Sequence, residues 1–232
     1  MSRRVVPGLL ALTCALLLTR PATVHGQVTV LEEGTFSLLQ RGVRVGREDF
    51  SIRRVQSSSG MTMIAQANVI SGETRRAVAL SVDSAGYPLR YSHETFQAGR
   101  SAEITTGESR GTLWSGRTLS VLGESAREFR LPVGTLAGEA EVAHQVWFLL
   151  RFRSDGPMGR LAPRAFEFQQ VTLRPTGSEL LRIGTADVAA QRWVIQSGDT
   201  VVQEVWTDSR GRLLRVRQPA LDLDAVRDDV PQ

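Results

Sequence analysis

Lysine is absent from this sequence of 232 residues, and cysteine occurs once. All 28 basic residues are arginine. Without lysine the chain cannot contain a Walker phosphate loop, a Schiff-base lysine or the catalytic lysine of a protein kinase. The single cysteine, Cys14, lies in an N-terminal apolar run. The chain beyond that run therefore has no disulfide, no thiol nucleophile and no thiolate metal ligand.

The first 26 residues have the order of a secretory signal peptide. Arg3 and Arg4 precede an apolar run over residues 5–18, and residues 24–26 suit cleavage before Gln27. The run is shorter than the roughly 20 residues that a membrane span needs. Cys14 lies inside the run, whereas a lipoprotein carries its cysteine after it. We therefore predict a signal peptide over 1–26, export to the periplasm or the medium, and no membrane span in the mature chain.

The mature chain has little net charge. Residues 1–26 hold three arginines and no acid, so the remainder has 25 arginines against 24 acidic residues, a net charge of +1. This balance gives no support for nucleic acid or an anionic membrane as a partner. The use of arginine in place of lysine, together with the signal peptide, suggests a bacterium with a GC-rich genome.

Apolar and polar residues alternate with period two along most of the mature chain, as in half-buried strands. Turn residues recur every 8–12 positions, which is typical of all-β proteins. Strands are predicted at residues 35–38, 43–55, 61–70, 78–82, 89–95, 102–106, 112–115, 117–122, 126–131, 165–173, 179–183, 190–196, 201–207 and 212–217. The clearest hairpin joins the last two through residues 208–211, and it places Trp206 and Leu214 on paired strands.

One segment, residues 138–153, predicts a helix instead. Val142, Val146, Leu149 and Leu150 follow helical spacing, and Gly156 with Pro157 ends the pattern. A helix this apolar should pack against a sheet. The fold class is therefore mainly β, a curved antiparallel sheet or half-open barrel with one apolar helix on its concave side. Residues 27–232 form a single β-rich domain with a short acidic C-terminal tail.

Few catalytic or metal-binding patterns are present. Residues 107–111 match the G-x-S-x-G nucleophile pattern around Ser109, but a strand-like segment follows where a helix is required. The pattern is better explained as a glycine-rich hairpin turn. The mature chain has two histidines, His93 and His144, which is too few for a typical zinc site. We place His144 on the helix surface or at its cap, and we predict no catalytic residue, metal or cofactor.

Large and adaptable apolar residues are the remaining candidates for a site. Tryptophans in a β-protein with few aromatics most often belong to the core. A sheet curved around an apolar helix can also leave a pocket for an acyl chain, and methionine suits such an irregular surface. The residues proposed to line it are Trp147, Phe148, Met61 and Met63. A core filled by these same side chains is the alternative.

The order of these features resembles uncharacterised exported bacterial β-proteins that are grouped as domains of unknown function. The similarity covers residues 34–228, and it depends on the apolar helix at 142–151 and the closing hairpin at 205–216. More distantly, the order is similar to the periplasmic lipoprotein carriers, whose half-open barrel holds acyl chains under a helix. The resemblance implies the fold and the compartment. No binding residue is carried over from it.

Three functions compete at this point. The favoured one is a non-enzymatic envelope protein that binds a hydrophobic or amphiphilic ligand, such as a lipid or acyl chain, in the concavity of the sheet. The second is an envelope interaction protein with a filled core and no small ligand. The third, a serine hydrolase that uses Ser109, is disfavoured. An open apolar cavity would favour the first function and a filled interior the second, while protein partners stay unknown.

Overall fold

The computed structural model describes residues 27–58 and 60–231, so the predicted signal peptide lies outside the described residues. The strands of the first half are β1 (Gln27–Gln40), β2 (Val43–Ser57), β3 (Gly60–Ser71), β4 (Thr74–Val82), β5 (Pro88–Gln97), β6 (Arg100–Arg110), β7 (Leu113–Ser120) and β8 (Gly123–Arg130). Those of the second half are β9 (Leu136–Ala137), β10 (Met158–Ala162), β11 (Glu167–Ile183), β12 (Ala186–Ser197), β13 (Thr200–Thr207), β14 (Leu213–Gln218) and β15 (Leu223–Arg227). The helices are the 3-10 turn η1 (Ala143–Gln145), α1 (Val146–Arg151) and the 3-10 turn η2 (Pro219–Leu221).

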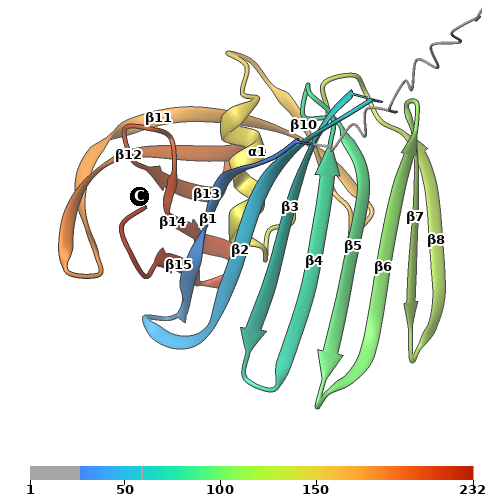
Figure 1. The fold of residues 1–232 in the computed structure, drawn as a ribbon, viewed down its shortest axis with the longest axis horizontal. Coiled ribbons are helices and arrows are strands. Elements are labelled where there is room, and N and C mark those ends of the chain that lie inside the picture. Colours follow the sequence, from blue (N-terminus) through green and yellow to red (C-terminus); the bar gives the residue numbers. More distant parts are fainter. Residues whose placement is uncertain (1–26, 59, 232) are drawn as a thin grey trace, which may run out of the picture.

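These 15 strands of the described chain form one open, curved sheet (Figure 1). The order across the sheet runs from β8 back to β1, continues to β15, and then runs back to β9. Neighbours are antiparallel except for β9 and β10, which are parallel. Because β8 and β9 are the two ends of this order, the sheet does not close into a barrel. The prediction of a curved, mainly antiparallel sheet is confirmed.

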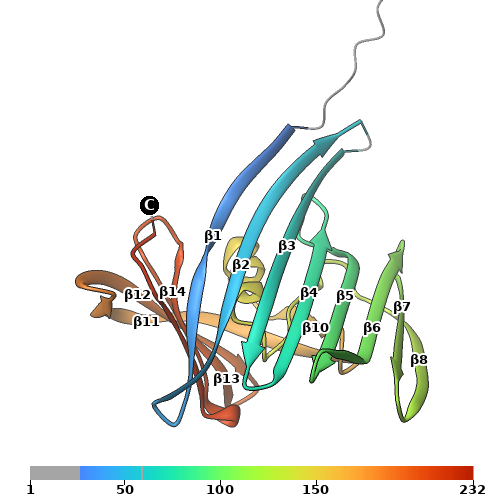
Figure 2. The same ribbon diagram turned by 60° about the horizontal axis from the view of Figure 1, so that its bottom comes forward.

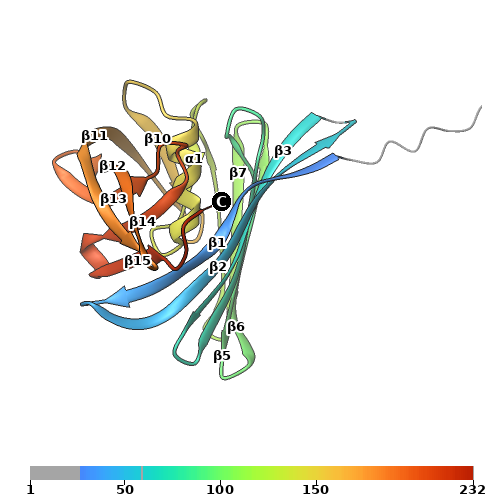
Figure 3. The same cartoon turned by 60° about the vertical axis from the view of Figure 1, so that its left-hand side comes forward.

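The two halves of the sheet face each other across α1. Strands β1–β8 make a broad layer, and β10–β15 curl back so that α1 lies between the two (Figures 1 and 3). Strands β1, β2 and β3 extend at one end beyond the rest of the layer (Figure 2). The alternation that predicted these strands is visible in β3, where Met63, Ala65 and Val69 face the interior. Among the described residues, no helix is long and apolar enough to cross a bilayer.

The helix is shorter than the sequence pattern predicts. Residues 138–153 were expected to be helical, but only η1 and α1 are, because the chain enters them from an extended Val142 with φ of −124°. The buried Glu48 carboxylate of β2 accepts hydrogen bonds from the backbone N–H groups of Ala143, at 2.9 Å, and His144, at 2.8 Å. This side chain therefore fixes where the helical turns begin.

His144 is not on the helix surface, as we expected, but fully buried. Its Nδ1 lies 2.8 Å from a Glu48 oxygen, and its ring stacks on Phe50 with centroids 5.6 Å apart. Phe50 stacks in turn on Phe36, at 5.0 Å. The helical segment is therefore attached to β2 by both an aromatic stack and a buried carboxylate.

The interior around the helix is filled by the chain's own side chains. Every residue from Val142 to Leu150 is buried, so this segment has no solvent-exposed face. Opposite it lie apolar side chains of β1–β4 and β13–β15, including Phe36, Ile52, Leu80, Val205, Val216 and Ala225. The concave side of the sheet is therefore a hydrophobic core rather than an empty cavity.

Candidate functional site

The four predicted ligand-binding residues are not brought together. Phe148 and Met63 lie in the hydrophobic core, and Met61 is half-buried on β3, opposite Gln56 of β2. Trp147 packs edge-on against Phe148, with ring centroids 5.4 Å apart, and keeps 8% of its surface exposed. Of the four, Trp147 is the one that combines a place in the core with a place at a cavity. The ligand-binding role of these residues stays a prediction.

The cavity beside Trp147, here called the Trp147 pocket, has a volume of about 590 Å³. It lies between β1, α1, β12 and the turn that joins β13 to β14. Its apolar lining comes from Leu31, Trp147, Leu150 and Trp193, and its charged lining includes Arg151, Arg153, Arg210 and Arg212. The wall therefore combines aromatic and aliphatic side chains with four arginines and two acids, Glu32 and Asp208. Such a combination is typical of a site for an amphiphilic molecule.

The turn on one side of the pocket is held by hydrogen bonds to Asp208, a residue that the sequence pattern already placed in the turn. The Asp208 carboxylate accepts hydrogen bonds from the backbone N–H groups of Arg210, at 2.8 Å, and Arg212, at 2.9 Å. It also accepts a bond from the Arg212 side chain, at 2.7 Å, and Gly211 has the positive φ of +80° that the turn needs. Trp206 and Leu214 lie on the paired strands β13 and β14. The predicted hairpin is confirmed.

Trp193 forms a second aromatic wall. Its indole N–H donates to the Thr207 hydroxyl, at 3.2 Å, which fixes the ring orientation. The Arg153 guanidinium lies 5.0 Å from the centre of this ring and donates to the carbonyl oxygen of Leu150, at 2.6 Å. A cation over an aromatic face is held by the ring quadrupole. Arg153 therefore links α1 to β12 across the pocket.

A buried acid is part of the pocket wall. Glu32 of β1 accepts hydrogen bonds from Arg227 of β15 and from the backbone N–H of Leu213, both at 2.8 Å. Arg227 also donates to the carbonyl oxygen of Glu33, and Gly34 leaves room for its guanidinium, which a Cβ there would overlap. Burial raises the pKa of Glu32 to about 7, although the bonds from Leu213 and Arg227 act against it.

A different, polar group of side chains, here called the His93 cluster, lines a cavity of about 470 Å³. It lies between β5–β7, the segment before η1 and the β10–β11 hairpin. Its charged members beside His93 are Glu103, Glu139, Glu141, Arg160, Arg164 and Glu167. These groups largely satisfy one another: Arg164 binds Glu103 at 2.8 Å and Glu141 at 3.4 Å, while Arg160 donates to the carbonyl oxygen of Gly138 at 3.0 Å.

His93 is held neutral within this cluster. Its ring nitrogens lie 3.1 Å from the Tyr91 hydroxyl and 3.3 Å from the Thr95 hydroxyl. Burial, reinforced by the charges of Arg164 and Arg76, lowers the pKa of His93 to about 4. A neutral histidine with both nitrogens occupied has the features of a structural residue rather than of a proton donor to a ligand.

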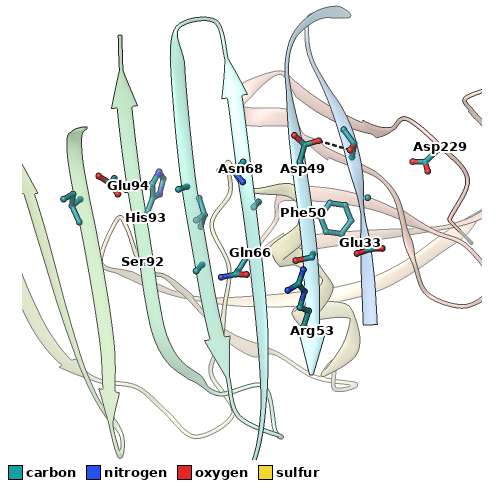
Figure 4. A pocket seen from close by; sticks show the side chains of 18 residues that line it. Glu33, Asp49, Phe50, Arg53, Gln66, Asn68, Ser92, His93, Glu94 and Asp229 are labelled. Carbon is teal, nitrogen blue, oxygen red and sulfur yellow. Dashed lines mark hydrogen bonds between the residues drawn. The ribbon is translucent and has the colours of Figure 1, made fainter. Parts of the chain in front are cut away.

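A third hollow of about 840 Å³ crosses the outer face of β1–β6 (Figure 4). Most of its lining residues alternate with buried ones, such as Asp49 and Ser51 of β2 on either side of the buried Phe50, which also lines the hollow. The Thr35 hydroxyl donates to Asp49 there, at 2.8 Å. The small side chains of Ala77 and Ala79 lie near the middle of this hollow. It lacks the aromatic wall of the Trp147 pocket.

The nucleophile interpretation of Ser109 has no support in the fold. Ser109 lies on β6, and the chain then enters β7 through a hairpin rather than a helix. The Ser109 hydroxyl donates to the carbonyl oxygen of Pro88, at 2.6 Å. The sharp strand-to-helix turn that exposes a nucleophilic serine is therefore missing. The predicted turn at residues 107–111 is correct only for Gly111, because residues 107–110 belong to β6.

Comparison with known proteins supports the fold. No family model and no curated protein matches the sequence. Among solved structures, a β-barrel-like protein of the domain of unknown function DUF1849 from Brucella abortus superposes with a TM-score of 0.53. The match covers 85% of this chain and 95% of that one, at 10% sequence identity. This chain is thus similar in fold to a bacterial β-barrel-like protein of unknown function, as the sequence resemblance implied in part.

The sequence analysis missed the residues that complete the Trp147 pocket. Trp193 was not among the residues proposed to line a pocket, and neither were the arginines. A local signal existed, because Arg151 and Arg153 end the apolar segment and Arg210 and Arg212 lie in the predicted turn. Their convergence depends on how α1 packs against the β13–β14 hairpin, which no local pattern encodes.

Proposed function

We propose that this is an exported envelope protein, without catalytic activity, that binds an amphiphilic ligand in the Trp147 pocket. One observation carries the proposal: a cavity of about 590 Å³ joins an aromatic and aliphatic wall to a group of arginines. A pocket of this size is within the range of small-molecule sites. Export is inferred from the sequence of residues 1–26.

The proposed site lies at the border of the interior rather than in the concavity itself. The concave side is filled by α1 and by the core side chains around Phe148. An acyl chain could not enter there without displacing buried groups, at a cost of several kcal/mol. Trp147 and Leu150 are the residues of α1 that both contact this core and line the pocket.

A second candidate is an envelope interaction protein that binds no small molecule. The filled interior favours it, since a carrier of long acyl chains usually keeps a larger apolar cavity. On this view the arginines at the pocket would be ordinary surface charges. The two candidates differ in whether the Trp147 pocket takes up an apolar molecule.

The test is binding of a defined probe. Monomeric dodecanoate should quench or shift tryptophan fluorescence and raise the melting temperature of the wild-type protein. Trp147→Ala should weaken dodecanoate binding at least about tenfold, as expected for a central aromatic contact. Leu122→Ala is the matched control, because Leu122 is 96% exposed in the β7–β8 turn, and it should leave the affinity unchanged.

The opposite result would favour the second candidate. Dodecanoate and lysophospholipids would then change neither the fluorescence nor the melting temperature, and native mass spectrometry of freshly purified protein would show no bound lipid. Binding that Trp147→Ala does not weaken would place the ligand elsewhere on the protein.

Export has its own test. We expect N-terminal sequencing of the exported protein to begin at or near Gln27. An intact Met1 in the exported fraction, or an acylated Cys14, would contradict the signal-peptide prediction.

A further inference from the structure

We propose that the ligand of the Trp147 pocket is an anionic amphiphile, whose carboxylate or phosphate group is bound at the opening by Arg151, Arg153 and Arg210. This inference rests on the proposed function, and it adds the charge and the orientation of the ligand. It begins from an excess of positive charge that the folded protein does not itself neutralise.

The acids at the pocket are already engaged. Asp208 binds the Arg212 side chain and two backbone N–H groups of its own turn. Glu32 binds Arg227, which lies deeper between β1 and β15. Within residues 27–58 and 60–231, neither acid comes within ion-pair distance of Arg151, Arg153 or Arg210. Three guanidinium groups around one cavity are therefore without a carboxylate partner.

These arginines come from both sides of the opening. Arg151 ends α1 and is exposed, and Arg153 follows it and lies over Trp193. Arg210 is exposed at the tip of the rigid β13–β14 turn. A guanidinium group donates up to five hydrogen bonds in a planar fork that matches a carboxylate or a phosphate. An anion at the opening would relieve the repulsion between these like charges.

The interior wall sets the direction in which the ligand would lie. Leu31, Trp147 and Leu150 offer an apolar surface, and Glu32 is part of the same wall. Arg227 is paired with Glu32, so the inner wall offers no unpaired cation to an anionic group. The charged group of the ligand is therefore expected at the arginines, and its hydrocarbon chain against the two tryptophans.

The experiment compares ligands that share one chain and differ in charge. Dodecanoate, dodecyl phosphate, 1-monolauroylglycerol and dodecylamine are titrated as monomers at pH 7.5, with tryptophan fluorescence and calorimetry as readouts. Both anions, or one of them, should bind at least about tenfold more tightly than the neutral glyceride, since a charge-assisted hydrogen bond contributes about this much. The tighter anion identifies the source, either a free fatty acid or a phosphorylated lipid.

A matched pair of triple variants tests the residues. Replacement of Arg151, Arg153 and Arg210 by glutamine should remove the preference for anions, so that dodecanoate and the glyceride bind about equally. The control replaces the exposed Arg100, Arg110 and Arg127 of β6 and β8 by glutamine, which changes the net charge by the same amount. This control should keep the preference, because its arginines are not at the pocket.

The outcomes separate the inference from the proposed function. If the wild-type protein binds all four compounds equally, or dodecylamine best, the anionic assignment is wrong and the amphiphile pocket stands. If none of the four binds, the proposed function itself is wrong. If the control variant loses the preference as fully as the pocket variant, net charge rather than the three arginines is responsible, and the assignment is wrong.

Discussion

The interior of the curved sheet has an apolar part and a polar part, and the two are stabilised differently. Under β1–β4, the side chains that face the interior are mostly apolar, and two buried bonded pairs interrupt them, Glu48 with His144 and Glu32 with Arg227. Under β5–β7, the corresponding positions carry His93, Thr105 and Thr118, which meet the arginines and acids of the His93 cluster. One continuous sheet thus combines a dry hydrophobic core with a titratable interior.

The difference between the apolar and polar parts bears on the proposed ligand site. The apolar part is filled by α1, whereas the polar part holds a cavity of about 470 Å³ whose charged side chains largely bind one another. The Trp147 pocket lies on the side of α1 that meets β12 and the β13–β14 turn, and it joins apolar side chains to arginines that have no carboxylate partner among the described residues. Stability and binding should therefore depend on different residues of α1, and the first of the following experiments tests this; the others test the polar part and the packing on β6.

The largest effect is expected from two neighbouring leucines of α1. Leu149→Ala and Leu150→Ala should each lower the free energy of unfolding by about 2–5 kcal/mol, through lost burial and a cavity. Only Leu150 lines the Trp147 pocket, so only Leu150→Ala should also weaken dodecanoate binding. Urea denaturation and fluorescence titration measure the two effects.

Leu180→Ala is the control for this pair, because Leu180 on β11 is 71% exposed. It should change stability by no more than about 0.5 kcal/mol. An equal loss of affinity in Leu149→Ala would contradict the separation between core and pocket.

The next effect is a pH dependence of stability, to which His93 of the polar part contributes. The pKa of His93 lies at about 4 in the folded protein, below the usual 6.5, so folding favours the neutral ring. The stability that this gives is fully present above pH 6.5 and is lost as the pH falls through 4. The shift corresponds to about 3 kcal/mol. Glu32, with its raised pKa, contributes in the opposite sense, since its stability is present below pH 4.5 and is lost as the pH rises through 7.

A variant isolates the His93 contribution from that of Glu32. The stability difference between wild type and His93→Gln should shrink by about 3 kcal/mol between pH 7 and pH 3.5, as measured by urea denaturation. NMR titration of the wild-type ring should give a pKa near 4. A ring that titrates near 6.5 would show that the polar part is open to water.

The smallest effect concerns packing on β6. A Cβ on Gly107 would overlap the buried Trp114 ring on β7, whereas a Cβ on Gly138 would meet Gln145 at ordinary contact distances of 3.6–3.9 Å. Gly107→Ala should therefore cost about 1–3 kcal/mol by overpacking. Gly138→Ala, the matched control, should stay within about 0.5 kcal/mol in thermal melting. Equal melting temperatures would mean that the polar part is loosely packed.

Local features of the sequence predicted much of the sheet. The β13–β14 hairpin was correct because Asp208 and Gly211 determine its turn within five residues. Strand β11 was predicted as two segments, because Pro175 and Gly177 are residues typical of a strand end. In the structure they form a β-bulge within one continuous strand. The short strands β9 and β10 were missed, because segments of two and five residues show no clear alternation. Strand β15 was missed as well, because its residues were assigned to an acidic C-terminal tail, whereas they pair with both β1 and β14.

The errors at the candidate site have a different cause. The helix was predicted too long, because its start depends on Glu48, which lies 95 residues before Ala143. The same carboxylate explains why His144 is buried. Similarly, the pair of Glu32 and Arg227 joins residues 195 apart. Such contacts depend on the complete sheet, so periodicity and turn patterns cannot locate them.

The pairing of β1 with β15 has a consequence for the order of folding. Phe36 lies opposite Arg227, so a strand that begins at residue 27 has its partner almost 200 residues later in the sequence. The hairpins from β2 to β8 can form from local contacts as the chain emerges, but the sheet becomes continuous only after β15 is available. Closing so long a loop costs conformational entropy before the contacts between β1 and β15 can stabilise it. This cost slows folding. A chain that crosses a membrane from its N-terminus would therefore stay incompletely folded until its last strand arrives.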